Sequence, residues 1–153
     1  MRKELILNFL DDSGLDKISY IDPIEKVLEE IGKDISSYAK GYFTYTVVVS
    51  STNGPSVKDL SVSSASLYIV VPEMGYDYKM FDIQYNIDKS NVTLNFFTLL
   101  TDQVEPKIIN TIDDWEVNLY NSIVDILNDN LADKIFRFIV DQIKMKREAN
   151  LDD

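Results

Sequence analysis

The feature that most limits the fold is a change in the spacing of apolar residues at Gly41. Between residues 22 and 40, apolar residues recur every three or four positions, which is the period of an amphipathic helix. Asp22 and Pro23 begin this segment with an N-cap residue and a proline at the first helical position. After Gly41, β-branched and aromatic residues alternate with polar ones, as in a strand with one buried face. The chain therefore combines a helix with a sheet that follows it.

Four segments between residues 42 and 101 have the composition and period of strands. They cover residues 42–51, 66–71, 79–87 and 92–100. The clearest alternation lies in the third segment, where Phe81, Ile83 and Tyr85 share one face. The connections after the first loop are short, so neighbouring strands are expected to pair antiparallel. We predict a four-stranded antiparallel meander, residues 42–101, with helices over one face.

Residues 105–148 carry helical spacing in two blocks that are out of phase. The first block has an apolar stripe made of Ile108, Ile112, Trp115, Leu119, Ile123, Ile126 and Leu127. At about 100° per residue, the apolar residues after Asn130 lie on the opposite side, which predicts a break at 128–130. We therefore expect a single α+β domain over residues 1–153. It would hold a short N-terminal element (1–14), the helix 22–40, the sheet, two C-terminal helices packed mainly on the same sheet face, and a tail (149–153).

The absence of two residue types excludes several kinds of chemistry. The chain has no cysteine and no histidine. Thiol nucleophiles, cysteine zinc sites, histidine-based hydrolysis and imidazole proton transfer are therefore excluded. No phosphate-binding glycine loop or calcium-binding loop motif occurs either. We predict no catalytic residue, no cofactor and no metal site.

Acidic residues are concentrated in one part of the chain. The net charge is −11, and residues 102–133 contribute one basic and eight acidic side chains to it. Residues Asp114, Asn118, Asn121, Asp125 and Asp129 recur every three or four positions, so they are expected on one stripe of a helix beginning near residue 106. Asp113 is expected in the first turns of the same helix. No lysine or arginine four residues away offsets these charges.

Two interpretations of this acidic stripe remain open. It is either a solvated helix face or a docking face for a basic protein, which would be steered to it by charge. Our leading hypothesis is a non-enzymatic inhibitor or immunity-type protein that neutralises a basic partner, for example a toxin. The predicted partner-binding residues are Asp113, Asp114, Asn118, Asn121, Asp125 and Asp129.

Two further functions were weighed against this hypothesis. One is a small oligomeric, chaperone-like assembly protein that uses an apolar sheet or helix surface, with a homodimer as its simplest form. The other is a hydrolase that depends only on carboxylates, since acidic residues alone can perform acid–base catalysis. The sequence does not decide among the three.

The remaining expectations concern location and polyanionic partners. The apolar run near the N-terminus covers six positions, fewer than the 7–15 or so of an export signal. We therefore expect a cytoplasmic protein. The negative net charge opposes binding to nucleic acid or to anionic membranes, so neither is predicted as a partner.

Overall fold

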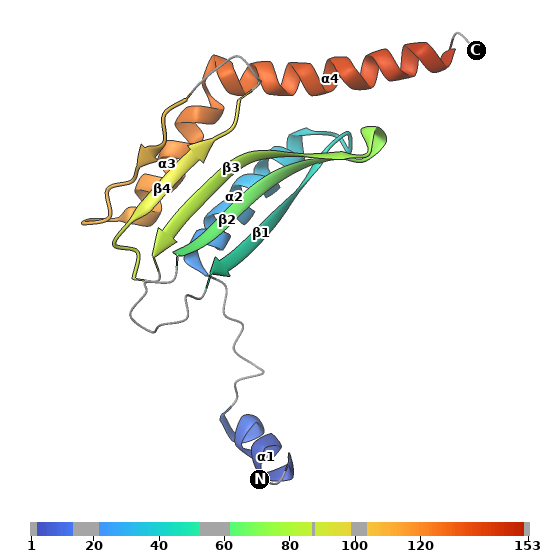
Figure 1. Ribbon diagram of the computed structural model, residues 1–153. Helices are drawn as coiled ribbons and strands as arrows, with labels where there is room; N and C mark the ends of the chain where they lie inside the picture. Colours follow the sequence, from blue (N-terminus) through green and yellow to red (C-terminus); the bar gives the residue numbers. More distant parts are fainter. Residues whose placement is uncertain (1–2, 14–21, 53–61, 87, 99–103, 152–153) are drawn as a thin grey trace.

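The computed structural model describes residues 3–13, 22–52, 62–86, 88–98 and 104–151 (Figure 1). The elements in chain order are α1 (Lys3–Ser13), α2 (Pro23–Tyr38), β1 (Thr44–Thr52), β2 (Val62–Val71), the 3₁₀ turn η2 (Pro72–Met74), β3 (Tyr76–Asn86), β4 (Val92–Phe96), β5 (Lys107–Ile108), α3 (Trp115–Leu127) and α4 (Asn130–Leu151). The fold class is α+β with an antiparallel sheet, which confirms the prediction.

The strands form a meander in the order β1-β2-β3-β4-β5. All neighbours pair antiparallel, and Val47, Leu67 and Phe81 face one another across the first three strands. The alternation read in the sequence therefore sets the register. A bulge between Leu67 and Tyr68 interrupts it, so that Met80 and Phe81 are both fully buried although they are adjacent.

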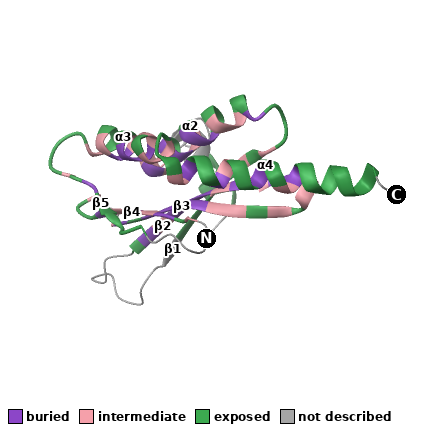
Figure 2. Ribbon diagram, turned by 90° about the horizontal axis from the view of Figure 1, so that it is seen from above, coloured by how far each residue is buried: buried purple, intermediate pink, exposed green. Residues whose placement is uncertain are grey.

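One face of the sheet is covered by α2 and α3, as Figure 2 shows. Asp22 starts α2 by accepting a hydrogen bond from the backbone N–H of Ile24 at 2.9 Å. The core between the layers is mainly aliphatic. Its fully buried members include Ile24, Leu28, Ile31, Leu67, Ile69, Phe81, Ile83, Leu94, Leu119, Ile123 and Ile135.

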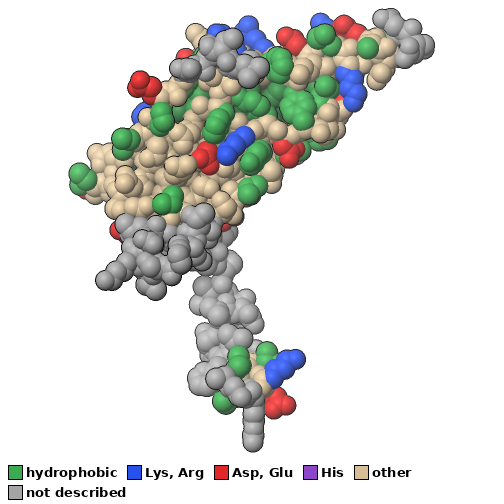
Figure 3. All heavy atoms as spheres, in the orientation of Figure 1, with side chains coloured by type: hydrophobic (Ala, Val, Ile, Leu, Met, Phe, Trp, Pro, Cys, Tyr) green, Lys and Arg blue, Asp and Glu red, His purple; other side chains and the backbone are tan. Residues whose placement is uncertain are grey.

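The opposite face of the sheet carries mainly polar side chains, with apolar ones scattered among them (Figure 3). The hydroxyls of Ser50 and Ser64 lie 2.8 Å apart across β1 and β2. Ser66 donates a hydrogen bond to the buried carboxylate of Asp82, also at 2.8 Å. These side chains satisfy one another, so this face needs no helix to cover it.

α4 runs along the end of the sheet where β1 begins and where the chain turns from β2 to β3 (Figure 1). The ring of Phe136 stacks on that of Phe43, with centroids 5.6 Å apart. The hydroxyl of Tyr76 donates a hydrogen bond to Gln142. The predicted break between the two C-terminal helices is present, and the Asp129 carboxylate accepts a hydrogen bond from the Asn130 backbone N–H at 2.7 Å.

The prediction of a helix from about residue 106 was wrong. Lys107 and Ile108 pair with β4 as a fifth strand, and the backbone N–H of Ile109 bonds to the carbonyl of Val92 at 2.9 Å. Ile108 and Ile112, expected on the apolar helix stripe, are exposed. Pairing with β4 satisfies backbone groups that would otherwise be open at the sheet edge, and this overrides the helical spacing. The sheet thus has five strands instead of four.

The first and last helices compare with the prediction in different ways. The short N-terminal element is the helix α1, which Figure 1 shows apart from the other elements, with Leu5, Ile6 and Leu7 exposed. The last helix extends through Leu151, three residues beyond the predicted end. Within the described residues, no helix has the length and apolarity needed to cross a bilayer.

Candidate functional site

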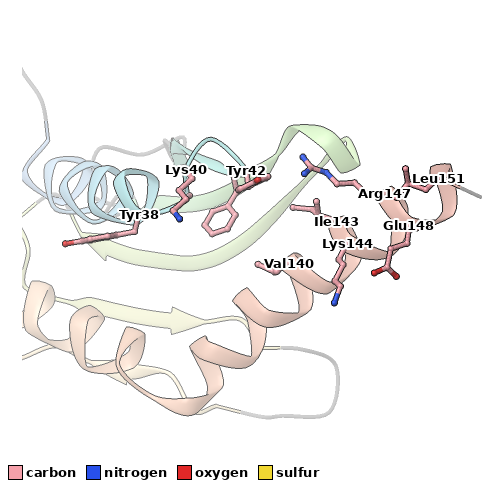
Figure 4. A pocket seen from close by; sticks show the side chains of 11 residues that line it. Tyr38, Lys40, Tyr42, Val140, Ile143, Lys144, Arg147, Glu148 and Leu151 are labelled. Atoms are coloured by element: carbon pink, nitrogen blue, oxygen red, sulfur yellow. The ribbon is translucent and has the colours of Figure 1, made fainter.

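A pocket of about 540 Å³ lies between the junction of α2 with β1 and the C-terminal half of α4 (Figure 4). It is lined by Tyr38, Ala39, Lys40, Tyr42, Phe43, Val140, Ile143, Lys144, Arg147, Glu148 and Leu151. These residues come from two segments that are far apart in the chain, 38–43 and 140–151. A pocket of this size is in the range that proteins use for specific ligands.

The first wall depends on a sharp turn after α2. The backbone N–H of Tyr42 bonds to the carbonyl of Ala39 at 3.0 Å. Lys40 and Gly41 both have positive φ, 52° and 81°, which glycine adopts without strain and lysine rarely does. This turn reverses the chain, so that Tyr38 at the end of α2 and Tyr42 before β1 both line the pocket.

The second wall is the C-terminal half of α4, which is held by η2. Arg147 donates two hydrogen bonds to the carboxylate of Glu73, at 2.7 and 2.9 Å, and Lys146 donates to the Glu73 carbonyl. The hydrogen bond from Arg147 lowers the pKa of the Glu73 carboxyl below its usual value. These bonds hold the C-terminal half of α4 close to η2. Val140 and Ile143 point toward the pocket (Figure 4).

A second pocket of about 240 Å³ continues the first one toward α3. Its lining is Ile35, Tyr38, Phe43, Leu127 and Phe136. Both pockets share Tyr38 and Phe43, so they adjoin one another, and we call the two together the α2–α4 groove. Tyr38 is 86 % exposed at its edge and Val140 is 50 % exposed in its wall.

The rim of the groove carries two lysines beside one glutamate, Glu148, in an otherwise acidic protein. Lys40 and Lys144 line it, are exposed, and form no ion pair within the described part of the chain. The guanidinium of Arg147 lies 5.1 Å from the centre of the Tyr42 ring, a cation–π contact. An apolar floor with two free cations at its edge suits a ligand that is apolar in the middle and acidic at its ends.

The six residues predicted from the acidic stripe lie on or beside α3 and outside the groove. Asp113, Asp114, Asn121, Asp125 and Asp129 are exposed. The first two precede α3, and Asp114 occupies its N-cap position with φ 48° and no side-chain cap. The structure therefore leaves these carboxylates exposed at the two ends and on one side of α3.

Asn118 has a structural task instead. Its amide nitrogen donates hydrogen bonds to the carbonyls of Asp113 and Asn110, at 2.8 and 3.1 Å. These bonds fasten the start of α3 to the segment after β5. Asn118 is only partly exposed and is less available to a partner than its neighbours on the stripe.

The groove was missed by sequence reasoning because its walls are far apart in the chain. One signal was present, since Tyr38, Tyr42 and Leu151 are large apolar residues at or beyond helix ends, where burial by the same helix is least complete.

No group of three or more His, Cys, Asp or Glu residues that could hold a metal occurs among the residues the structure describes.

Comparison with known proteins gave no relative. No family model, no curated protein sequence and no solved structure matches this chain.

Proposed function

We propose that this protein is a non-enzymatic binding module whose α2–α4 groove holds an amphipathic helix of a partner protein. The observation that supports this proposal best is the α2–α4 groove itself. It is an apolar depression between two walls, with aromatic side chains exposed at its edge. Large apolar patches with a charged rim are typical of protein interaction sites. Helix-in-groove recognition uses an apolar stripe laid into such a depression.

The dimensions favour a short helix as the occupant. From Val140 to Leu151, the α4 wall is about 17 Å long at 1.5 Å per residue, or three helical turns. A helix of that length presents three or four apolar anchors on one stripe. Lys40 and Lys144 favour acidic residues beside those anchors.

Val140 offers a direct test with a matched control. Val140→Asp places a charge in the groove wall, whereas Val117→Asp makes the same change on the exposed side of α3, where the valine is 55 % exposed. The probe is a fluorescein-labelled helical peptide with leucines on one stripe and glutamates beside it. We expect anisotropy to show at least tenfold weaker binding for Val140→Asp and unchanged binding for Val117→Asp.

A second peptide makes this test selective. A scrambled peptide of the same composition has no apolar stripe, and it should not bind the wild-type protein. Equal binding of the two peptides, or equal loss with both valine variants, would reject the groove as the binding site.

The acidic side of α3 supports a second candidate, the binding of a basic protein. Asp113, Asp114, Asp125 and Asp129 form no ion pair within the described residues, so their charges are available. Reversing Asp114 and Asp125 to lysine should abolish binding of a lysine-rich peptide and its salt dependence. Asp77→Lys, at an exposed position of β3, is the control. Unchanged affinity after the double reversal would reject this candidate.

A further inference from the structure

Within the part of the chain that the structure describes, the strand β1 is an edge of the sheet and pairs on one side only, with β2. It is nine residues long, Thr44–Thr52, and contains no charged residue and no proline. The opposite edge, β5, has two residues, and one of them is Lys107. Proteins usually protect edge strands by making them short, or by placing charges or prolines on them, and β1 has none of these features.

The apolar layer is also incomplete at this edge. Val47 and Val49 lie on the core side of β1, opposite Leu67 and Ala65 of β2. Both β2 residues are fully buried, whereas Val49 is 41 % exposed and Val47 only partly buried. On the other face, Val48 is exposed as well. At the β1 edge, backbone groups without a partner strand and apolar side chains are therefore exposed to solvent side by side.

The sequence of β1 is complementary to itself when two copies run antiparallel. If Val48 of one copy lies opposite Val48 of another, Val47 faces Val49 and Thr46 faces Ser50. Apolar residues then meet apolar residues, and hydroxyls meet hydroxyls, which are favourable cross-strand pairs. The hydroxyl contact between Ser50 and Ser64 shows that β1 already makes such a pair on its inner side.

The lack of charge on β1 permits a second copy to occupy this edge. Each chain carries −11, so two copies repel one another over most of their surfaces. The uncharged strand β1 is where two chains can meet with the least repulsion. A strongly charged partner, in contrast, finds no complementary charge on this strand.

We propose that two copies of this protein associate through antiparallel pairing of their β1 strands, centred on Val48, to form one continuous sheet. The interface is isologous, because the same residues of both copies meet across a two-fold axis. The pairing satisfies the open backbone groups of both edges and covers Val47 and Val49. The α2–α4 groove is not part of this interface, so a dimer would present two grooves.

The absence of cysteine makes site-specific cross-linking a clean test. In the proposed register, Val48→Cys places two thiols opposite each other, and mild oxidation or a short bifunctional thiol reagent should yield a covalent dimer. Gln84→Cys is the control, because Gln84 is exposed on the same face of the sheet but lies on the inner strand β3. It should yield only monomer.

The register is tested with two further variants. Thr46→Cys or Ser50→Cys alone should not cross-link, since identical positions would lie about 13 Å apart along the strands. A mixture of the two should cross-link, because residue 46 faces residue 50 of the other copy. Efficient cross-linking of Thr46→Cys with itself would overturn the proposed register.

Mass measurement tests the association without cross-linking. Light scattering should give twice the chain mass of 17.6 kDa for the wild type and for Gln84→Lys, and the single mass for Val48→Lys. Circular dichroism checks that Val48→Lys is folded, and the conservative cysteine variants keep the test valid if it is not. A wild-type protein of single mass at all concentrations, or equal cross-linking of Val48→Cys and Gln84→Cys, would overturn the proposal.

Discussion

At the scale of single residues, Gly32 of α2 lies directly against the ring of Tyr45 of β1. A Cβ atom built on Gly32 would lie 2.2 Å from Cδ2 and 2.5 Å from Cγ of the Tyr45 ring. The same ring carries a hydroxyl that donates a hydrogen bond to Glu29 at 2.7 Å. Gly32 therefore weakens the helix locally but allows α2 to lie close to the sheet.

Gly32→Ala is expected to destabilise the protein despite the better helix propensity of alanine. Propensity alone would favour alanine by about 1 kcal/mol, whereas overpacking costs about 1–3 kcal/mol. The atoms nearest the new methyl group belong to the base of the ring, which cannot move without losing the bond to Glu29. We expect a net loss of up to about 2 kcal/mol in urea unfolding. Lys33→Ala, an exposed change in the same helix, should have little effect, and a stabilised Gly32→Ala would contradict this account.

Tyr45 also gives the protein a dependence on alkaline pH. The hydrogen bond to the Glu29 carboxylate, together with burial and the charge of Glu29, raises the pKa of Tyr45 to about 12. The folded state therefore holds the phenolic proton more tightly than the unfolded chain, whose pKa is about 10. This contribution to stability is complete below pH 10 and is lost between pH 10 and about 12.

Tyr45→Phe tests that titration directly. In melting experiments, the wild type should lose more stability than Tyr45→Phe between pH 10 and 12. Parallel curves for the two proteins over this range would show that the proton of Tyr45 is not linked to folding. Tyr38→Phe, at a tyrosine that is 86 % exposed, serves as the control.

At the scale of elements, the position of α4 depends on its contacts with η2 and β3. The ion pair between Glu73 and Arg147 and the hydrogen bond between Tyr76 and Gln142 both act on the C-terminal half of the helix. Phe136 anchors the first half against Phe43. These contacts set the width of the α2–α4 groove.

Glu73→Gln should loosen the C-terminal half of α4 without unfolding the protein. We expect faster amide hydrogen exchange across residues 143–151 and weaker binding of the helical peptide. The folded-state pKa of Glu73 is lowered, so its contribution is present above the unfolded pKa and is lost as pH falls. The difference between variant and wild type should therefore vanish in acid.

Glu148→Gln is the matched control for that change. Glu148 lines the groove but forms no ion pair within the described residues. Its exchange rates should equal those of the wild type at neutral pH. If both glutamate variants accelerated exchange equally, net charge and not the bond to Arg147 would explain the effect.

At the scale of the whole molecule, charge and apolar surface lie in different places. The carboxylates of α3 face solvent, the groove has lysines at its rim, and β1 has no charge. This arrangement gives the two proposed partners, a helix and a second copy, separate surfaces. Its long-range repulsion still opposes self-association.

Dimerisation should therefore strengthen as salt is added. Screening shortens the range of the repulsion between two chains of −11, while pairing of the uncharged β1 strands is little affected. Sedimentation analysis at low and high ionic strength should show a lower dissociation constant at high salt. Weaker association at high salt would indicate that attractive ion pairs, and not β1 pairing, hold the dimer.

The helix α2 and the strands of the sheet could be predicted because the sequence signals for them lie within a few residues of each element. Asp22 and Pro23 begin α2, and the change of period at Gly41 marks the turn into β1. The alternation around Phe81 and Ile83 settled which residues face the core. Helix capping and two-residue alternation depend on neighbours a few positions away, so a single sequence records them.

The site and the edges were decided by tertiary structure. Helical spacing through Ile108 and Ile112 was overridden by pairing with β4, which no local pattern records. The groove exists because residues near position 40 and residues after 139 lie together at one end of the sheet. The sequence by itself determines the spacing of apolar residues, the net charge and the kinds of chemistry that the chain lacks. The tertiary structure decides which backbone groups are paired and which apolar side chains stay exposed, because the segments involved meet only in the folded chain.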